Sequence, residues 1–319
     1  MINLNSKIFV AGHNGLVGNA ILKKLKEKGY KNILTASRKK LDLTNQKKVY
    51  EFFKKNKPKF VFLAAAKVGG ILSNQKYKAE FIYNNLSIQL NVINSAYKNG
   101  VKDLIFLGSS CVYPRNCKQP IKEEYLLNGK LEKTNDAYAI AKIAGIKMCQ
   151  SYNKQYKTNY KCLMPTNTYG EKDNYHEENS HFIPAMIKKL HKIKNHKKPK
   201  LKIWGDGSPK REIIYVEDLA EACVFFMKKK TKKNLINIGT GIDYSIKEYA
   251  KILAKTIIPN KKILFYFDKS KPNGTPRKVM DVSLAKSYGW KSKSKLENTL
   301  LDTYNFFLKE NNVSRIKKK

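Results

Sequence analysis

The sequence lacks any long apolar run. Its longest, Phe60 to Ala66, has seven residues, whereas a helix needs about 20 apolar residues to cross a bilayer. The stretch from Met1 to Lys7 has no apolar core of the kind that a signal peptide carries. The five cysteines are odd in number and scattered, without the spacing of a metal site or a disulfide framework. These absences predict a cytoplasmic protein with no bound metal and no membrane partner.

Acidic residues are scarce as well. The chain has 25 Asp and Glu against 64 Lys and Arg, a net charge of +39. Such an excess is typical of proteins that bind nucleic acids or anionic membranes. The lysines are spread over every segment, however, which indicates a compositional bias rather than a dedicated binding groove. We therefore expect no nucleic-acid partner, although a positive field would speed the capture of a small polyphosphate substrate.

A glycine-rich motif follows the first apolar run. Ile8 to Ala11 has the composition of a strand, Gly12, Gly15 and Gly18 come next, and Asn19 to Leu25 has the composition of a helix. Strand, glycine turn and helix are the context in which such glycines bind a dinucleotide. The first glycine permits the tight turn, the second lets the backbone approach the pyrophosphate, and the third allows helix and strand to pack closely. An ordinary glycine-rich turn is the alternative.

Arg38 indicates which dinucleotide is bound. It follows the second predicted strand, Asn32 to Ala36. NAD-binding folds usually place an acid here for the ribose 2′-hydroxyl, whereas a basic residue suits a 2′-phosphate. Arg38 therefore predicts NADPH/NADP as the cofactor. The alternative is a solvated surface cation in a basic chain.

Alternating strands and helices predict the fold class. Further strands are expected at 59–66, 101–107, 160–164, 213–216 and 235–239, the last two returning to the sheet, and helices at 84–96, 138–156, 182–194, 246–257 and 296–308. This alternation predicts an α/β protein with a Rossmann-type doubly wound parallel sheet and a smaller α/β C-terminal substrate lobe. We assign residues 1–170 plus about 213–240 to the NADP-binding domain, and about 171–212 plus 241–319 to the substrate-binding lobe.

Tyr138 and Lys142 form the motif with the most chemical content. They are four residues apart in a helical pattern, so their side chains lie on one face. A free tyrosine has a pKa of about 10, and a neighbouring ammonium lowers it toward the range useful for acid–base catalysis. The strand that ends at Leu107 is followed by Ser109, at the edge of the sheet where ligands bind. A surface Tyr–Lys pair, common in lysine-rich helices, is the alternative.

These pieces together resemble the extended short-chain dehydrogenase/reductase superfamily and, within it, the GDP-L-fucose synthase family. The resemblance covers Ile8 to Leu308, and the strings that carry it are Ala64–Ile71, Leu107–Pro114, Tyr138–Lys147, Met164–Asn167, Asn179–Pro184 and Lys271–Lys278. Its most specific features are the cysteine in Ser-Ser-Cys and the later Asn-Ser-His. The chain departs from the family pattern at Asn14, where a basic residue is expected, and at Asn273, which is commonly Asp.

The resemblance implies a substrate, GDP-4-dehydro-6-deoxy-D-mannose, and a homodimer. It implies epimerisation at C3 and C5 followed by reduction of C4 with NADPH. In that reaction Cys111 is the base and His181 the acid, Ser109 and Tyr138 donate hydrogen bonds to the enolate oxygen, and Lys142 lowers the pKa of Tyr138 and reaches the nicotinamide ribose. A thiol with a pKa near 8.5 and an imidazole near 6.5 bracket neutral pH. Alternatively, Cys111 is a buried small apolar residue and His181 a helix cap or core polar residue.

The resemblance also implies two sets of ligand contacts. The expected cofactor contacts are Gly12, His13, Asn14, Gly15, Leu16, Val17, Gly18, Arg38, Leu107, Gly108, Ser109, Ser110, Lys142, Pro165, Thr166, Asn167, Thr168 and His181. The expected substrate contacts are Lys189, Trp204, Arg211 and Lys278. Plain packing is the alternative for the tryptophan and the arginine. Two other functions stay open, an NAD-dependent nucleotide-sugar epimerase or 4,6-dehydratase, and a basic nucleic-acid-binding protein built on a reductase fold.

Overall fold

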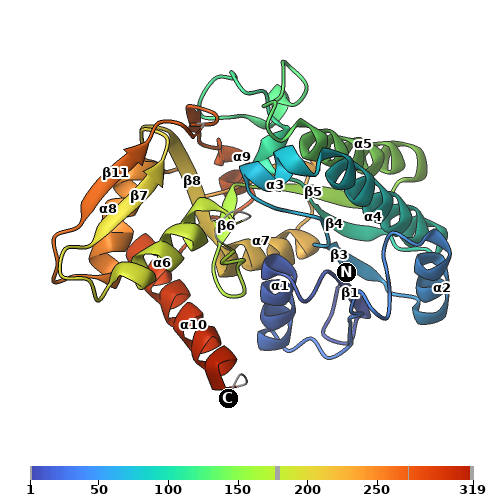
Figure 1. Cartoon of the computed structure of the whole chain (residues 1–319). Coiled ribbons are helices and arrows are strands. Elements are labelled where there is room, and N and C mark those ends of the chain that lie inside the picture. The colour runs from blue at the N-terminus through green and yellow to red at the C-terminus, as the bar shows by residue number, and fades with distance from the viewer. Residues whose placement is uncertain (1, 177–179, 272, 317–319) are drawn as a thin grey trace.

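The computed structural model describes residues 2–176, 180–271 and 273–316 (Figure 1). Asn179 and residue 272, which belong to the strings quoted above, lie outside the described residues. In chain order the elements are β1 (Ile8–Ala11), α1 (Leu16–Glu27), β2 (Ile33–Leu34), α2 (Gln46–Asn56), β3 (Phe60–Leu63), α3 (Ile71–Lys76), α4 (Lys78–Lys98), β4 (Asp103–Leu107), α5 (Asp136–Tyr156), β5 (Asn159–Pro165), β6 (Asn167–Tyr169), α6 (Phe182–Ile193), β7 (Lys200–Trp204), β8 (Lys210–Tyr215), α7 (Val216–Lys228), β9 (Leu235–Ile238), β10 (Asp243–Ser245), α8 (Ile246–Ile257), β11 (Leu264–Asp268), β12 (Arg277–Lys278), α9 (Ser283–Ser287) and α10 (Leu296–Ile316).

A six-stranded sheet in the order β2-β1-β3-β4-β5-β9 forms the centre of the molecule. All its strand pairs are parallel. Strands β1 and β3 are apolar and buried along their whole length, as expected of a parallel sheet covered on both faces. The order of the strands reverses between β1 and β3, so the carboxyl ends of these strands form the usual ligand-binding edge. The predicted doubly wound parallel sheet is confirmed.

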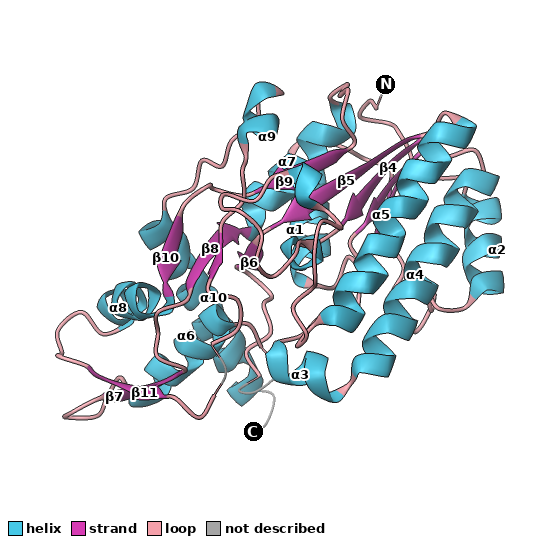
Figure 2. Cartoon of the chain, turned by 90° about the horizontal axis from the view of Figure 1, so that it is seen from above, coloured by secondary structure: helices cyan, strands magenta, loops and turns pink. Residues whose placement is uncertain are grey.

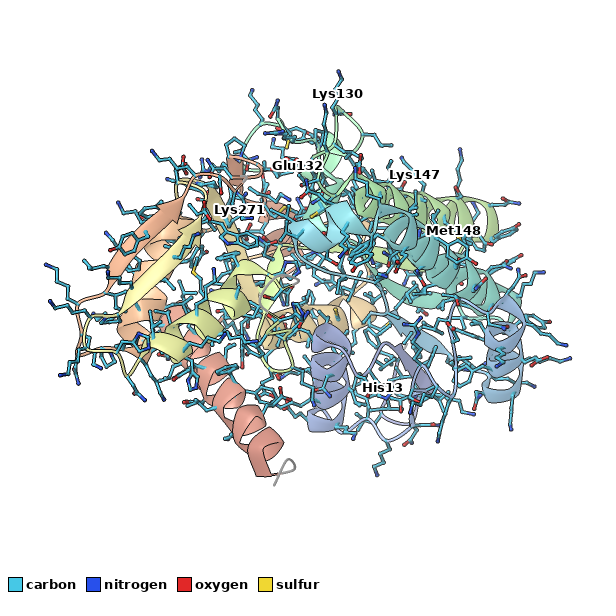
Figure 3. All side chains as sticks on the ribbon, viewed as in Figure 1. His13, Lys130, Glu132, Lys147, Met148 and Lys271 are labelled. Carbon is cyan, nitrogen blue, oxygen red and sulfur yellow. The ribbon has the colours of Figure 1, made fainter. Side chains whose placement is uncertain are left out.

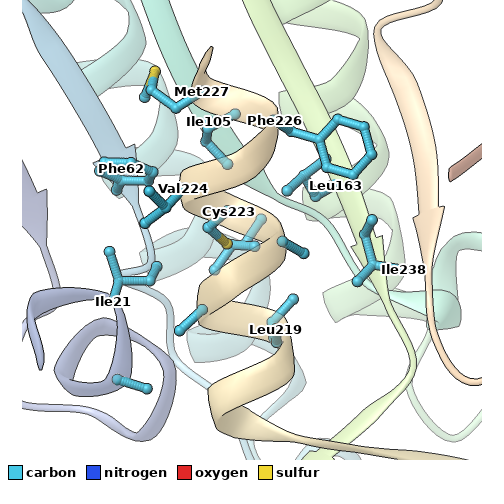
Figure 4. Packing of buried hydrophobic residues seen from close by; sticks show 14 of the residues in the cluster. Ile21, Phe62, Ile105, Leu163, Leu219, Cys223, Val224, Phe226, Met227 and Ile238 are labelled. Carbon is cyan, nitrogen blue, oxygen red and sulfur yellow. The ribbon is translucent and has the colours of Figure 1, made fainter. Parts of the chain in front are cut away.

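Helices cover both faces of this sheet. Helices α1 and α7 pack on one face and α2, α4 and α5 on the other, as the ribbon shows (Figure 1). Helix α7 presents Leu219, Cys223 and Phe226 to the sheet and lies against Ile21 of α1 and Phe62 of β3 (Figure 4). Because both faces are buried in this way, only the ends of the strands are open for a ligand.

A second sheet corrects one strand prediction. Residues 213–216 were expected to return to the main sheet, but β8 lies in a separate sheet in the order β10-β8-β12, with β6 also paired to β8. Strand β6 follows β5 almost directly, after Pro165, so the chain leaves the main sheet there and offers β8 a parallel partner. Only β9, near the predicted 235–239, rejoins the main sheet. Apolar periodicity identifies a strand but does not say which sheet it joins.

A third core lies beyond the second sheet. It gathers α6, α8, α10 and the parallel pair β7–β11, which lie on the far side of β8 from the main sheet (Figure 2). Helix α8 begins with a complete capping box between Ser245 and Glu248 and occupies the predicted residues 246–257. No helix among the described residues is long and apolar enough to span a membrane. The predicted division of the chain into two domains stays a prediction.

Candidate active site

The glycine loop joins β1 to α1 at the carboxyl edge of the sheet. Gly12 has φ +89°, in the left-handed region that favours glycine, and its carbonyl accepts a hydrogen bond from the Gly15 N–H at 3.0 Å. A Cβ on Gly18 would lie 2.1 Å from the Gly12 carbonyl oxygen, so the loop and helix can approach this closely only without a side chain there. The interpretation that Gly18 serves close packing of helix and strand agrees with this geometry.

The same loop has the features of a dinucleotide site. The first N–H groups of α1 follow Gly15 and have no acidic side chain in the first turn, so they can receive a diphosphate. His13, beside α1 in Figure 3, has a buried Nδ1 without a hydrogen-bond partner, and burial lowers the pKa of its ring. An orphaned polar atom in a glycine-rich turn fits a bound cofactor. Arg38 is exposed beyond the end of β2, where the ribose 2′-phosphate is expected.

The remaining expected cofactor contacts come from neighbouring strand ends. Leu107 and Gly108 lie at the end of β4, and the segment from Pro165 to Thr168 passes from the end of β5 into β6. The Lys142 Nζ donates to the Leu107 carbonyl at 2.7 Å, which ties α5 to the edge of the sheet. The structure therefore brings most of the expected cofactor contacts to the carboxyl edge of β1, β4 and β5.

Ser109 and Cys111 stand where β4 gives way to a short 3-10 turn, Ser110–Val112. The Ser109 Oγ accepts a hydrogen bond from the Cys111 N–H at 3.2 Å. The side chain of Ser109 also hydrogen-bonds Tyr138. One serine thereby connects the turn that carries the thiol to the helix that carries the phenol.

Tyr138 and Lys142 occupy successive turns of α5, as predicted. The Lys142 Nζ lies 5.8 Å from the centroid of the Tyr138 ring, and the lysine side chain is only 4% exposed. Burial lowers the pKa of Lys142 to about 8. Burial also raises the pKa of Tyr138, and Cys111 raises it further, while the hydrogen bond to Ser109 lowers it.

The expectation that Lys142 lowers the pKa of Tyr138 is therefore wrong for this structure. The lysine ammonium donates to the Leu107 carbonyl rather than to the phenol, and burial dominates the tyrosine. At neutral pH Tyr138 is protonated, which is the form that can donate a proton to a developing alkoxide. The pair retains its predicted placement, but its electrostatics differ from the prediction.

Two donors that lie far apart in the sequence converge on the thiol of Cys111. The Asn135 Nδ2 lies 3.4 Å from the Cys111 Sγ, and the Lys278 Nζ lies 3.7 Å from it. His181 immediately precedes α6 but makes no side-chain capping hydrogen bond, so it does not cap that helix. His181 is exposed at the surface, but the protein atoms around its ring desolvate it and lower its pKa, and the charge of Lys278 lowers that pKa further. The ammonium of Lys278 therefore acts on both Cys111 and His181.

The expected substrate contacts lie on the C-terminal side of the site. Trp204 ends β7, and the ammonium groups of Lys189 and Lys271 lie 5.5 and 5.7 Å from its ring centroid. Arg211 of β8 donates to the Asn273 carbonyl at 3.3 Å, and its pKa is lowered by burial while the charge of Cys111 acts in the opposite direction. The structure places the arginine near the thiol, with the indole at the end of another strand.

Sequence reasoning missed two residues of the site. Asn135 precedes α5 in a pattern typical of a helix cap, which hid its contact with the thiol. Glu212, the neighbour of Arg211, is fully buried and accepts hydrogen bonds from the N–H groups of Gly241 and Met280, both at 2.7 Å. Glu212 follows two cations, Lys210 and Arg211, at the start of β8, so its sequence context does not distinguish it from an exposed residue of the strand.

With this geometry in view, comparison with known proteins places the chain. A family model described as the NAD dependent epimerase/dehydratase family matches residues 8–239. The chain belongs to this family. Within the family it is 45% identical to the GDP-L-fucose synthase of Escherichia coli over 311 residues, covering 95% of this chain and 96% of that protein. It is 49% identical to GDP-L-fucose synthase 1 of Arabidopsis thaliana over 309 residues, with 97% and 95% covered.

Solved structures agree with this comparison. The GDP-mannoheptose C4 reductase MlghC of Campylobacter jejuni, with NADP bound, has a TM-score of 0.88 and 39% identity, covering 97% of this chain and 100% of that one. A GDP-L-fucose synthetase of Naegleria fowleri bound to NADP also has a TM-score of 0.88, with 26% identity and 98% and 95% covered. The backbone of this chain is therefore shared with reductases that act on GDP-sugars.

Proposed function

We propose that this chain is a GDP-L-fucose synthase that converts GDP-4-dehydro-6-deoxy-D-mannose to GDP-L-fucose. The observation that carries the proposal is the meeting of two chemical pairs in one site. Tyr138 and Lys142 form the pair expected of a reductase, and Cys111 and His181 form an acid–base pair around the ammonium of Lys278. A reductase that does not epimerise has no need for the second pair.

Epimerisation comes first in the proposed mechanism. The C4 ketone acidifies the hydrogens on C3 and C5, so a base on one face of the sugar ring can remove each of them. Cys111, with two N–H donors within 3.7 Å of its sulfur, serves as that base. His181 returns a proton from the opposite face; its lowered pKa makes the imidazolium a stronger acid and also makes it the minor form at neutral pH. Ser109 and Tyr138 donate hydrogen bonds to the enolate oxygen.

Reduction at C4 follows. NADPH, when bound, supplies the hydride. The glycine turn from Gly12 to Gly18 and the N-terminus of α1 hold its diphosphate, and Arg38 binds the 2′-phosphate. Tyr138 is protonated at neutral pH and donates its proton to the C4 oxygen. Lys142 already lies at the end of β4 and reaches the nicotinamide ribose from there.

The GDP part of the substrate meets the cationic side of the site. Arg211 binds the diphosphate, Lys278 lies beside it on the adjacent strand as a substrate contact, and Lys189 adds a further cation. Trp204 offers its indole face to a ring of the substrate. Residues 1–170 plus about 213–240 bind NADPH, and about 171–212 plus 241–319 form the substrate lobe. Five free cysteines suit a protein of the reducing cytoplasm.

Deuterium exchange separates the two halves of the reaction. Without NADPH, wild-type protein in D₂O with GDP-4-dehydro-6-deoxy-D-mannose should introduce deuterium at C3 and C5, observed by NMR. Cys111→Ser should abolish this exchange, and Cys117→Ser, at a half-buried thiol of the same loop, should retain it. With NADPH, wild type should oxidise the cofactor at 340 nm.

Each failure points to a different alternative. Oxidation of NADPH without exchange would replace the proposal by a C4 reductase like the Campylobacter relative. Neither exchange nor oxidation by well-folded protein would leave an epimerase, a dehydratase or a binding protein. Comparison of NADPH with NADH in the same assay reports on the cofactor preference assigned to Arg38.

We also propose a homodimer that pairs through α4 and α5. Large apolar side chains are exposed on these neighbouring helices: Tyr83 is 68%, Leu90 48% and Ile140 48% exposed. Packing α4 and α5 against their symmetry copies would bury them around a two-fold axis. Light scattering at micromolar concentration should give the mass of two chains, and Leu90→Arg should give one. A wild-type protein of monomeric mass would contradict the proposal.

A further inference from the structure

Asn135 holds the position of a helix cap without acting as one. It is the N-cap residue of α5, and asparagine is among the residues that most favour this position because its oxygen accepts from the first free N–H groups. No such hydrogen bond is made by Asn135. Asn45 provides the internal comparison, since as the N-cap of α2 it accepts from the Lys48 N–H at 3.0 Å. The same residue type caps one helix of this chain and not the other.

The amide of Asn135 is directed at the thiol instead. Its Nδ2 lies 3.4 Å from the Cys111 Sγ, while its Oδ1 is buried without a hydrogen-bond partner. The Lys278 Nζ approaches the same sulfur at 3.7 Å from β12. Two N–H donors on one sulfur suit a thiolate, which accepts both, better than a thiol, whose sulfur is a weak acceptor.

Cations outnumber acids among the charged side chains around the sulfur. Arg211 of β8 lies near enough for its charge to interact with Cys111. Arg115, Glu132, Arg277 and Lys278 line one small pocket together with Cys111. Glu132, in the loop above α3 in Figure 3, is the acid of this set, and Arg115 pairs with it at 3.3 Å. Among the described residues, the phenol of Tyr138 also interacts electrostatically with the thiol, and Lys278 does so with His181.

We propose that Asn135, acting with Lys278, is a positioning residue that holds Cys111 as a thiolate oriented for proton abstraction. This inference rests on the proposed role of Cys111 as the base. The amide donates to the thiolate before the proton is removed from the sugar. Afterwards the neutral thiol needs an acceptor, and a turn of the same amide would offer it the unpartnered Oδ1. Leucine would fill the space and supply neither group.

The test measures thiolate formation directly and needs no sugar substrate. The rate of alkylation of Cys111 by iodoacetamide is followed from pH 5 to 10 by mass spectrometry, since only the thiolate reacts. Trypsin cleavage after Arg115 places Cys111 and Cys117 on separate peptides. We expect Asn135→Leu to raise the midpoint by about one pH unit, which lowers the alkylation rate roughly tenfold at pH values below the wild-type midpoint. Lys278→Met should raise the midpoint too, and Asn135→Asp, which places a negative charge beside the sulfur, should raise the midpoint most.

Asn45→Leu is the matched control. It removes a real capping hydrogen bond, so it should lower the melting temperature without moving the alkylation midpoint. Asn135→Leu should do the reverse, because its side chain caps nothing. An unchanged midpoint in Asn135→Leu, or a melting temperature lowered as in Asn45→Leu with unchanged alkylation, would overturn the proposal and make Asn135 structural. Absence of sugar turnover in the wild type, with the midpoint shifted as expected, would overturn only the proposed function.

Discussion

Replacing Gly18 or Gly15 by alanine tests two different roles of the glycine loop. Gly18 is expected to allow close packing inside the protein, and Gly15 to leave space for the cofactor. A Cβ on Gly18 would lie 2.1 Å from the Gly12 carbonyl oxygen and 2.9 Å from the His13 nitrogen. Gly12 cannot shift away from a new Cβ on Gly18, because its other side is close to Ala65: a Cβ on Gly12 would lie 2.7 Å from the nitrogen of that residue. A Cβ on Gly15 meets only the Gly12 carbonyl oxygen, at 3.5 Å, which is an ordinary contact.

These contacts set the expected sizes. Overpacking lowers the free energy of unfolding by about 1–3 kcal/mol, whereas replacing glycine by alanine within a helix raises it by roughly 1 kcal/mol. Because the loop is confined on both sides, we expect Gly18→Ala to lose about 2 kcal/mol of unfolding free energy, or about 4–8 °C in melting temperature. Gly15 has φ −84°, which alanine adopts without strain, so Gly15→Ala should melt within about 2 °C of the wild type.

Cofactor affinity completes the comparison. A methyl group on Gly15 would stand at the N-terminus of α1, where the diphosphate approaches, and should raise the dissociation constant of NADPH at least about tenfold. Gly18→Ala should weaken NADPH binding as well, but it should also lower the melting temperature. Differential scanning fluorimetry and titration of nicotinamide fluorescence measure the two quantities. Wild-type stability and affinity in Gly18→Ala would refute the reasoning, and so would undiminished affinity in Gly15→Ala.

Two further predictions concern a surface cation and a buried acid. Arg38→Ala should raise the dissociation constant of NADPH about tenfold while leaving NADH nearly unchanged, measured by the same titration; equal weakening of both would contradict its assignment to the 2′-phosphate. Burial raises the pKa of Glu212 to about 7 from 4.5, so the folded protein binds the proton more tightly than the unfolded chain does. The contribution of this proton to the free energy of unfolding is fully present below about pH 4.5 and is lost as the pH rises through about 7. The loss amounts to about 3 kcal/mol. Glu212→Gln should flatten that slope in urea titrations, and an unchanged slope would exclude Glu212 as its source.

The parts of the site that are local in sequence could be predicted from it. Strand, glycine turn and helix lie within about 20 residues, and their geometry follows from the absence of side chains at Gly12 and Gly18. Tyr138 and Lys142 are placed by helical spacing alone, which tertiary contacts do not change. The pKa of Tyr138 was not predictable in this way, because it depends on burial and on Cys111, which comes from another element.

The parts that depend on long-range pairing could not be predicted. Strand β8 was expected in the main sheet because its apolar run does not distinguish one sheet from another. Helix α7 escaped notice although it packs beside α1 on one face of the sheet, and the short strand β2 is less than half its predicted length. Asn135 was hidden because a residue before a helix normally caps it, and only the position of Cys111 shows otherwise.

The register of the second sheet decides which cation faces the thiol. Strand β12 pairs with β8 so that Lys278 lies beside Arg211 and Arg277 beside Lys210. Because strand side chains alternate, a slip of one residue would turn Lys278 away from Cys111. Arg277 opposes such a slip, since its guanidinium binds Asp243 of β10 through two hydrogen bonds of 2.6 and 3.0 Å. A surface ion pair contributes little stability by itself, but here it holds in place the strand that carries Lys278 to the thiol.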